Sequence, residues 1–483
     1  MDPKTKRILD LFQQINEIPR CSKNEGKIVL WLRQWAESNR FPVKVDTAGN
    51  MVITVAPSDG YEQSPGIVIQ GHVDMVCEKS PDSDHNFSKD PIRHLVEENW
   101  LRADKTTLGA DNGIAIAMAM ALATDDQVAH PTLELLFTVD EETGLNGAKL
   151  LEPGFVKGKI LLNVDSETEG EFTVGCAGGR HTHVSQKLAF TGLNGNHSYF
   201  GLKMQGLHGG HSGIDIHKQR ANANKVLART LDQLSTSCQI SLISLKGGTT
   251  HNAIPRDATA TFACSPSQAA AVTKVVGDFE KTLQTEYAAI EPLLALSLFP
   301  VDSGPKDNMA LTKQETRKVI DLILSLPHGV MGMSPDFEGL VETSNNLATV
   351  EIVDDSLKIL TSQRSSVMSR MDEATTIIRA AASLAGADSQ SGSEYPPWTP
   401  AMQSALLKQC QEVYTNVSGR EPVIQSIHAG LECALIGDKY EGMDMISFGP
   451  TMEDPHSPSE RLFIPSIGKV WEFMVALLAS YKE

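Results

Sequence analysis

The sequence has few features of a nucleic-acid-binding or membrane-bound protein. Its 42 Lys and Arg residues are outnumbered by 60 Asp and Glu residues, which gives a formal net charge of −18, and it has no basic stripe that would bind phosphates. No apolar run reaches the roughly 18 residues that a membrane-spanning helix needs, and the N-terminus leads into an amphipathic helix rather than a signal peptide. We therefore expect no nucleic-acid partner, no membrane partner and a cytoplasmic location.

Cysteine is also sparse, and its seven occurrences form no pattern. The cysteines are scattered singly, without a Cys-x-x-Cys pair, and their number is odd. This distribution is typical of a reduced protein and not of a disulfide scaffold. The sequence therefore predicts free thiols.

The chain is long enough for more than one domain. Its 483 residues exceed the roughly 250 to 300 at which a single core stops growing. Hydrophobic residues make up 41% and charged residues 21%, and no low-complexity tract is present, so the composition is that of a folded globular protein. Two domains are the natural expectation.

Apolar runs in the first part of the chain predict the strands of an open sheet. They lie at residues 51–55, 66–70, 132–138 and 159–164, and helical segments separate them. Such runs favour an α/β sheet that is covered by helices on both faces. Ligands of open α/β sheets bind beyond the carboxyl ends of the strands, so polar residues that follow these runs are candidates for a functional site.

The pattern changes after residue 179. Residues 180–394 predict a β-α-β-β-α order, typical of a ferredoxin-like sandwich, followed by a looser second round. A segment rich in Gly, Ser and Pro at 386–400 predicts the linker that leads the chain back to the first domain. We therefore predict an α/β fold in which an open mixed-sheet catalytic domain, formed by residues 1–179 and 395–483, is interrupted by an inserted α+β ferredoxin-like lid domain.

Five residues at strand ends and helix entrances have the chemistry of metal ligands: His72, Asp111, Glu142, Asp165 and His456. Taken singly, each has an ordinary explanation. His72 could be a satisfied polar residue, Asp111 a helix cap and Asp165 a turn residue. Their shared placement after predicted strands, at a helix start or in a Pro-bounded loop makes a common site the better interpretation.

The neighbours of these residues support a metal site. Asp74 follows His72 by two positions, and metal-bound imidazoles usually donate their other N–H to a carboxylate. The adjacent Glu141 and Glu142 would repel each other unless a cation compensates or one is protonated. Local pattern does not decide which of these two binds metal and which acts as a base.

The ligand types and their number indicate two metal ions. Nitrogen and oxygen ligands without cysteine suit catalytic Zn²⁺, and also Mn²⁺ or Co²⁺. Five protein ligands exceed what one open zinc site needs, so two metals that share the Asp111 carboxylate are the simplest solution. Such pairs lie about 3.5 to 4 Å apart and activate a water for hydrolysis.

Several segments together resemble one known family. They are Gly-His-Val-Asp-Met-Val at 71–76, Thr-Leu-Gly-Ala-Asp-Asn-Gly at 107–113, Glu-Glu at 141–142, Asn-Val-Asp-Ser-Glu at 163–167, Gly-Gly-His-Ser-Gly at 209–213, Asn-Ala-Ile-Pro-Arg at 252–256, His-Ala-Gly-Leu-Glu at 428–432 and Pro-His-Ser-Pro at 455–458. In this order, over nearly the whole chain, they resemble the two-zinc aminopeptidases, carboxypeptidases and aminoacylases of the glutamate-carboxypeptidase type.

The resemblance implies a role for each metal-site residue. One metal would be held by His72, Asp111 and Asp165, and the other by Asp111, Glu142 and His456. Glu141 would be the general base, and Asp74 would orient His72.

The resemblance also implies roles for residues of the inserted domain. His211 would stabilise the tetrahedral oxyanion, and an arginine would hold the substrate's terminal carboxylate. We assign this arginine as Arg364, because it lies on a late strand and its guanidinium suits a carboxylate; a surface ion pair is the alternative. Asn252 and Arg256 are further candidates for substrate binding.

The activity that the resemblance implies is hydrolysis of unblocked dipeptides, with histidine at the second position and carnosine-like substrates included. Tripeptidase, carboxypeptidase and aminoacylase activities are alternatives within the family, and a catalytically inactive peptide-binding protein is an alternative outside it. The partners expected are a small peptide, two divalent metal ions per subunit and, through the inserted domain, a second copy of the chain.

Overall fold

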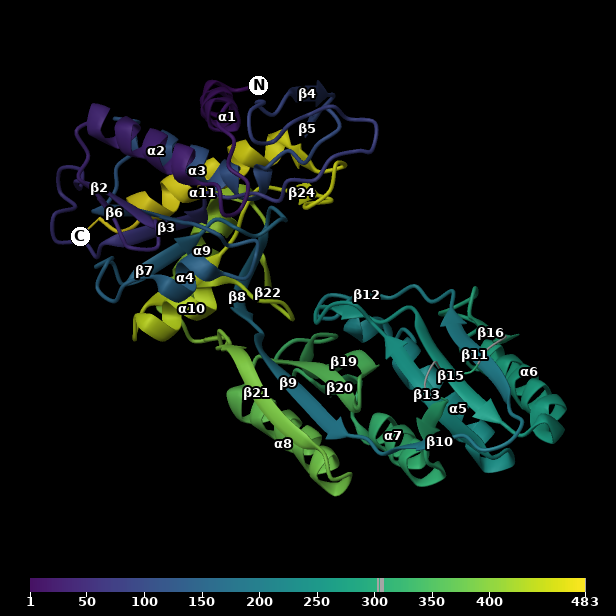
Figure 1. The fold of residues 1–483 in the computed structure, drawn as a ribbon. Helices are drawn as coiled ribbons and strands as arrows, with labels where there is room; N and C mark the ends of the chain where they lie inside the picture. The colour runs from purple at the N-terminus through teal and green to yellow at the C-terminus, as the bar shows by residue number, and fades with distance from the viewer. Residues whose placement is uncertain (302–303, 305–307, 483) are drawn as a thin grey trace. The chain divides into compact units, whose positions relative to one another are not determined.

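The computed structural model describes residues 1–301, 304 and 308–482. The chain forms two compact units (Figure 1). The first comprises Met1–Cys176, Trp398–Ser426 and Leu431–Glu483, and the second comprises Ala177–Pro397 and Ile427–Gly430. The expected domain boundaries at residues 179/180 and 394/395 stay predictions.

An eight-stranded mixed sheet forms the centre of the first unit, in the order β1-β2-β6-β3-β7-β23-β8-β22. The strands β6, β3, β7 and β23 are parallel neighbours, whereas β1 and β2 add to one edge in antiparallel orientation. Every residue of β3 and β6 is buried, as expected of central strands with cover on both faces. The strands are β1 (Val43–Val45), β2 (Met51–Val55), β3 (Ile67–His72), β6 (Leu133–Thr138), β7 (Ile160–Asn163), β8 (Glu171–Cys176), β22 (Val423–Ile427) and β23 (Asp444–Ser447).

Helices flank this sheet on two sides. Figure 1 shows α2 and α3 on one side of β3, β6 and β7, with α4 and α10 on the other. Helix α3 is buried along nearly its whole length, because its Ala, Ile and Met side chains are apolar all round. The helices are α1 (Pro3–Asn16), α2 (Gly26–Ser38), α3 (Ala110–Ala123), α4 (Asn146–Leu150), α9 (Ala405–Ser418), α10 (Glu432–Lys439) and α11 (Ile464–Ala479). A small sheet has the order β24-β25-β5-β4, from β4 (His94–Glu97), β5 (Trp100–Ala103), β24 (Met452–Glu453) and β25 (Arg461–Phe463).

One expectation about the cysteines is wrong. Cys21 and Cys77 form a disulfide across 56 residues of sequence, with their Cα atoms 5.7 Å apart, a separation that suits the bond. The other five cysteines form no disulfide and are buried. The pairing arises because a parallel bridge between Cys21 and Met75 brings the two segments together, and the spacing of the cysteines along the chain gives no sign of this contact.

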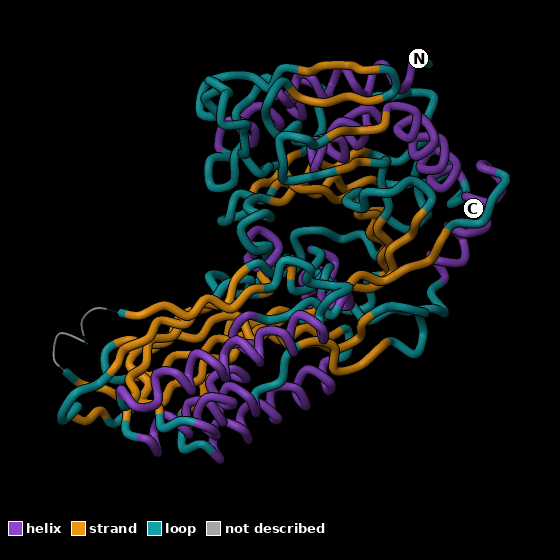
Figure 2. Tube along the Cα trace, turned by 90° about the vertical axis from the view of Figure 1, so that its right-hand side faces the viewer, coloured by secondary structure: helices purple, strands orange, loops and turns teal. Residues whose placement is uncertain are grey.

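A nine-stranded sheet forms the second unit, in the order β16-β11-β15-β13-β19-β20-β9-β21, with β18 paired to β19. Figure 2 shows the helices of this unit lying along one side of its strands. The strands are β9 (Gly178–Lys187), β11 (Ser198–Gln205), β13 (Ile240–Gly247), β15 (Ala258–Cys264), β16 (Ala295–Pro300), β18 (Gly329–Met333), β19 (Val341–Val353), β20 (Ser356–Ser365) and β21 (Asp388–Tyr395); the helices are α5 (Ala223–Ser237), α6 (Ala269–Glu286), α7 (Lys313–Ser325) and α8 (Met368–Leu384). Two short ribbons add β10 (Phe190–Gly192) with β17 (Met309–Leu311), and β12 (Gly210–His211) with β14 (Ala253–Ile254).

The order β11-α5-β13-β15-α6 is the β-α-β-β-α order that the sequence predicts. The expected linker at 386–400 is corrected in part, because β21 occupies residues Asp388–Tyr395 and pairs with β9. Its sequence is rich in Ser and contains Gly, which is typical of a loop. An edge strand needs few apolar residues, so such a polar segment can still form one. In the described part of the chain, no helix is both long enough and apolar enough to cross a membrane.

Candidate metal centre

The five predicted ligands lie together in the first unit. His72 is the last residue of β3, Glu142 follows the end of β6 by four residues, and Asp165 follows the end of β7 by two. These strands are parallel neighbours, so their carboxyl ends meet at one edge of the sheet. Asp111 lies in the first turn of α3, and His456 lies in the loop between β24 and β25.

The two carboxylate oxygens of Asp111 face two different histidines. Its Oδ1 lies 3.0 Å from His72 Nε2, and its Oδ2 lies 3.0 Å from His456 Nε2. Asp165 Oδ1 lies 3.6 Å from His72 Nε2, and Glu142 Oε2 lies 3.0 Å from His456 Nε2. In each of the two groups that the family resemblance implies, the possible ligand atoms lie within 4.8 Å of one another. Asp111 is the member that they share.

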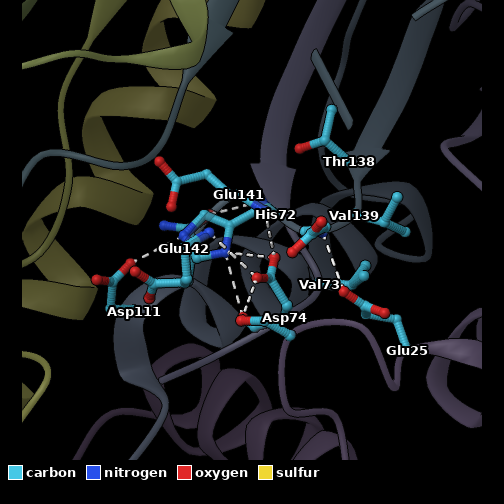
Figure 3. Close-up of polar contacts among 12 residues, drawn as sticks. Glu25, His72, Val73, Asp74, Asp111, Thr138, Val139, Glu141 and Glu142 are labelled. Atoms are coloured by element: carbon cyan, nitrogen blue, oxygen red, sulfur yellow. Dashed lines mark hydrogen bonds and ion pairs between the residues drawn. The ribbon is translucent and has the colours of Figure 1, made fainter. Parts of the chain in front are cut away.

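Asp74 orients both His72 and the glutamate pair (Figure 3). His72 Nδ1 lies 3.3 Å from Asp74 Oδ1, and the same carboxylate accepts the backbone N–H groups of Glu141 and Glu142 at 3.0 and 3.2 Å. Ser22 Oγ donates to its other oxygen at 2.8 Å. Although burial raises the pKa of Asp74, these bonds outweigh it and lower the pKa to about 2. With a proton on Nδ1, His72 presents its Nε2 lone pair to Asp111 and Asp165, as a metal ligand requires.

The site concentrates negative charge. Burial, with repulsion from Glu142 and Asp165, raises the pKa of Glu141 well above its usual range, and burial with repulsion from Asp111 raises the pKa of Glu142. Hydrogen bonds to Asp111 and Glu142 raise the pKa of His456 to about 11. The Oε1 atom of Glu142 is buried without a hydrogen-bond partner among the described residues. A donor set of this kind, with oxygen and imidazole nitrogen converging, fits divalent cations.

Asn112 holds the Asp111 turn against the strand ends. Its Oδ1 accepts the backbone N–H of His72 at 3.2 Å, and its Nδ2 donates to the carbonyl of Val164 at 2.7 Å. A Cβ at Gly71 would lie 2.3 Å from Asn112 Oδ1, so this close approach requires glycine. The sequence motif contained Asn112, but no role for it could be read from the pattern.

A buried network lies between the strands next to the centre, and sequence reasoning assigned it no role. Glu432 bonds Gln70 Nε2 and Thr138 Oγ1, each at 2.6 Å, and Asn163 Nδ2 bonds Gln70 Oε1 at 2.6 Å. Burial raises the pKa of Glu432 to about 7. Two further groups have ligand atoms within 4.8 Å of one another. One is formed by His72, Glu141 and Glu142, and the other, without a histidine, by Glu25, Asp74 and Asp140.

The predicted catalytic histidine His211 lies in the second unit, on β12. Strand β12 pairs with β14, and Ser212 N–H donates to the carbonyl of Asn252 at 2.7 Å. The Nδ1 atom of His211 accepts the backbone N–H groups of Gly213 and Ile214 at 3.3 and 3.1 Å. The ring proton therefore sits on Nε2, which makes that atom a donor. His211 and Asn252 line a cavity of about 620 Å³ together with Arg256.

Arg364 lies on β20 of the same unit and is only 8% exposed. Its Nη1 donates to Tyr395 Oη at 3.0 Å, while its Nε has no hydrogen-bond partner within the described ranges. A Cβ on Gly213 would lie 3.1 Å from His211 Cε1 and 3.3 Å from Arg364 Nε, so the structure brings His211 and Arg364 together around this glycine. Arg256, in contrast, is 73% exposed and lies 3.6 Å from Asp257.

The chain is similar to several known proteins. A model of the peptidase dimerisation domain of the M20 type matches residues 202–291. The chain is 38% identical over 469 residues to the cytosol non-specific dipeptidase of Escherichia coli (strain K12), covering 97% of this chain and 96% of the relative. It also matches the crystal structure of aminoacylhistidine dipeptidase from Vibrio alginolyticus, at 36% identity and a TM-score of 0.87, covering 98% of this chain and 96% of that one. The aminopeptidase PepT of Bacillus cereus shares the fold, at 15% identity and a TM-score of 0.58, with 99% of both chains covered.

The fold and a carboxylate that lies between two histidines are consistent with a metal-dependent hydrolase. The chain belongs to the M20 metallopeptidase family. This membership confirms the family resemblance, the α/β fold with an inserted domain, and the expectation that the protein is a hydrolase.

Proposed function

We propose that the protein is a cytoplasmic two-metal dipeptidase that hydrolyses unblocked dipeptides, Xaa-His dipeptides among them. The observation that carries the proposal is the position of Asp111, whose two oxygens each lie 3.0 Å from a different histidine. The names of two relatives, a cytosol non-specific dipeptidase and an aminoacylhistidine dipeptidase, support the substrate class and the location.

The donors present would hold two divalent ions in one centre. We assign His72, Asp111 and Asp165 to one ion and Asp111, Glu142 and His456 to the other, with zinc as the expected metal and manganese or cobalt as alternatives. A pair of such ions, when bound, polarises a carbonyl group and lowers the pKa of water toward about 7.

Glu141 is the residue we assign as general base. It is adjacent to a proposed ligand, its backbone is fixed by Asp74, and no hydrogen bond or ion pair of its side chain is found among the described residues. A carboxylate at this position can take a proton from the attacking water and return it to the leaving amine.

The second unit supplies two further residues to the proposal. His211, with its proton on Nε2, is assigned as a donor to the oxyanion of the tetrahedral intermediate. Arg364 is assigned to the substrate's terminal carboxylate, because a buried guanidinium with an unused Nε–H favours an anionic partner. Asn252 and Arg256 line the same cavity as His211 and stay secondary candidates. The matched dimerisation-domain model supports a homodimer, which sedimentation can test.

The deciding experiment measures turnover of a peptide panel before and after metal removal. We expect hydrolysis of free dipeptides to stop on chelation and to return when zinc, manganese or cobalt is added back. Tripeptides and N-acylated amino acids should be poor substrates, and preferential cleavage of either would favour a tripeptidase or an aminoacylase. Glu141→Gln should keep its metal but lose about 10²- to 10⁴-fold in kcat, and near-normal turnover would remove Glu141 from the base role.

A further inference from the structure

Glu460 is a fully buried carboxylate, 1% exposed, that lies four residues after His456. It accepts four consecutive backbone N–H groups from the turn that carries Asp111. The donors are Leu108 at 2.7 Å and Gly109 at 3.0 Å to Oε2, and Ala110 at 2.8 Å and Asp111 at 3.3 Å to Oε1. The side chain therefore joins the loop of one predicted metal ligand to the turn of another.

These N–H groups surround the start of helix α3, where backbone donors have no partner within the helix. Gly109, at the N-cap position, has no side chain to cap them. Glu460 supplies the acceptors from a distant part of the chain, and its negative charge also suits the positive end of the helix dipole. The orientation of the first turn of α3, and of Asp111 within it, therefore depends on a residue about 350 positions away.

Arg20 holds the other side of the same turn. Its guanidinium is completely buried and donates to the carbonyl of Gly109, and also to the carbonyls of Val73 and Asp74 at 3.0 and 3.1 Å. The carbonyl side of the turn is thus tied to the Asp74 segment, while its N–H side is tied to the His456 loop through Glu460. The turn cannot shift relative to either segment without breaking these bonds.

We propose that Glu460 is a positioning residue for the two-metal centre. By fixing the Asp111 turn against the His456 loop, it sets the direction in which both oxygens of Asp111 point. This inference rests on the proposed function, because it treats Asp111 as the ligand shared by two metals. A residue that acts through the shared ligand should affect the affinity for both ions.

The substitution Glu460→Gln tests this role with little change in volume. Each carboxylate oxygen accepts two N–H groups, whereas a glutamine offers one oxygen and one NH₂ group. Two backbone donors would then face another donor, so the turn has to move. Glu460→Asp is the second variant, in case the first does not fold, because it keeps the charge on a side chain shorter by one methylene.

Glu134 provides a matched control. It is also a buried carboxylate that accepts two backbone N–H groups, from Lys157 and Gly158, both at 2.7 Å. It lies at the start of β6, whereas the metal centre lies beyond the strand's other end. Glu134→Ala removes these bonds and so should lower stability without altering the position of Asp111.

The experiment is a direct titration of metal-free protein with zinc in competition with a chromophoric chelator, for the wild type and the variants. We expect Glu460→Gln to weaken the binding of both ions by about 10- to 100-fold, the range typical of residues that orient metal ligands. Glu134→Ala should bind both ions as the wild type does. At saturating metal, kcat of Glu460→Gln should recover with KM unchanged.

Wild-type affinity in Glu460→Gln, or an equal loss of affinity in Glu134→Ala, would overturn the inference. If Glu460→Gln does not fold, the same two criteria apply to Glu460→Asp. Failure of the wild type itself to bind metal would overturn the proposed function and this inference with it. If the wild type binds zinc and the Glu460 variant binds it equally well, the inference about Glu460 is wrong but the proposed function stands.

Discussion

Replacing Asp74 by Asn tests how the centre orients its first ligand. Asp74 Oδ1 faces His72 Nδ1 and the backbone N–H of Glu141, and Oδ2 faces the backbone N–H of Glu142 and Ser22 Oγ. The two backbone N–H groups can only donate, whereas the imidazole and the Ser22 hydroxyl can each donate or accept. An asparagine must turn its NH₂ group toward one pair. When it faces His72, it favours a proton on Nε2, the atom that should bind metal.

The size of the effect follows from two independent quantities. The pKa of Asp74 falls from 3.8 to about 2, and at 1.36 kcal/mol per pKa unit the native contacts favour the charged carboxylate by roughly 2 kcal/mol. Loss of a carboxylate that orients a metal-bound histidine typically weakens metal binding by 10- to 100-fold, or about 1.4 to 2.7 kcal/mol. We therefore expect a loss of metal affinity within that range for Asp74→Asn.

The assay is zinc titration of metal-free protein, followed by turnover of a free dipeptide at saturating zinc. Asp140→Asn is the matched control, because Asp140 lies in the loop that carries Glu141 and Glu142 but bonds Thr143 and Asn146. Affinity of Asp74→Asn within about twofold of the wild type, or an equal loss in Asp140→Asn, would refute the reasoning. Because the pKa of Asp74 is depressed, its contribution to stability is present above pH 3.8 and is lost as pH falls through about 2.

Three further predictions follow from the structure. Asp111→Ala should lose both metals together whereas Asp165→Ala should mainly weaken one, as zinc stoichiometry will show; one tightly bound ion in Asp111→Ala would contradict the shared role. Arg364→Lys should raise KM for free dipeptides about 10-fold or more, since a charge-assisted bond contributes about 1.5 to 3 kcal/mol, and should leave C-terminally amidated peptides unaffected. Burial lowers the pKa of His328 to about 3, so the unfolded state binds the extra proton below pH 6.5, and stability should fall by up to about 1.4 kcal/mol per pH unit as the pH decreases. Denaturant unfolding at pH 7 and pH 5.5 should show a smaller decrease for His328→Gln than for the wild type.

Much of the candidate site could be predicted from the sequence because three of its five candidate ligands lie at or just after the ends of strands. Continuous apolar runs marked β3, β6 and β7, and the polar residues after them had to lie at one edge once the strands were parallel. The adjacency of Glu141 and Glu142 indicated a cation, although only the family resemblance assigned their separate roles. The positions of these residues could be predicted without knowing which strands pair.

The residues that orient the ligands could not be predicted in the same way. Glu460, Arg20 and Asn112 act through backbone groups, and backbone contacts leave no periodic signal in a sequence. The Cys21–Cys77 disulfide was missed for a related reason, since its 56-residue separation reflects a tertiary contact. The sequence predicts a linker where β21 lies, because an edge strand can be polar and no alternation of apolar residues marks this one.

Metal ligands and the residues that orient them should differ in how many metal ions are lost when they are substituted. A terminal ligand such as Asp165 serves one ion, so its loss should leave the other site largely formed. Asp111 serves both, and so should a residue that fixes its turn. Glu460, which touches no ligand side chain in the described structure, should therefore disturb two-metal binding more broadly than Asp165, which is itself a proposed ligand. If the effect of a substitution depended only on the distance of the residue from the metals, Asp165→Ala would disturb metal binding more than Glu460→Gln. Comparing the two variants therefore shows whether metal binding depends more on the position of the shared Asp111 carboxylate or on direct ligand contacts.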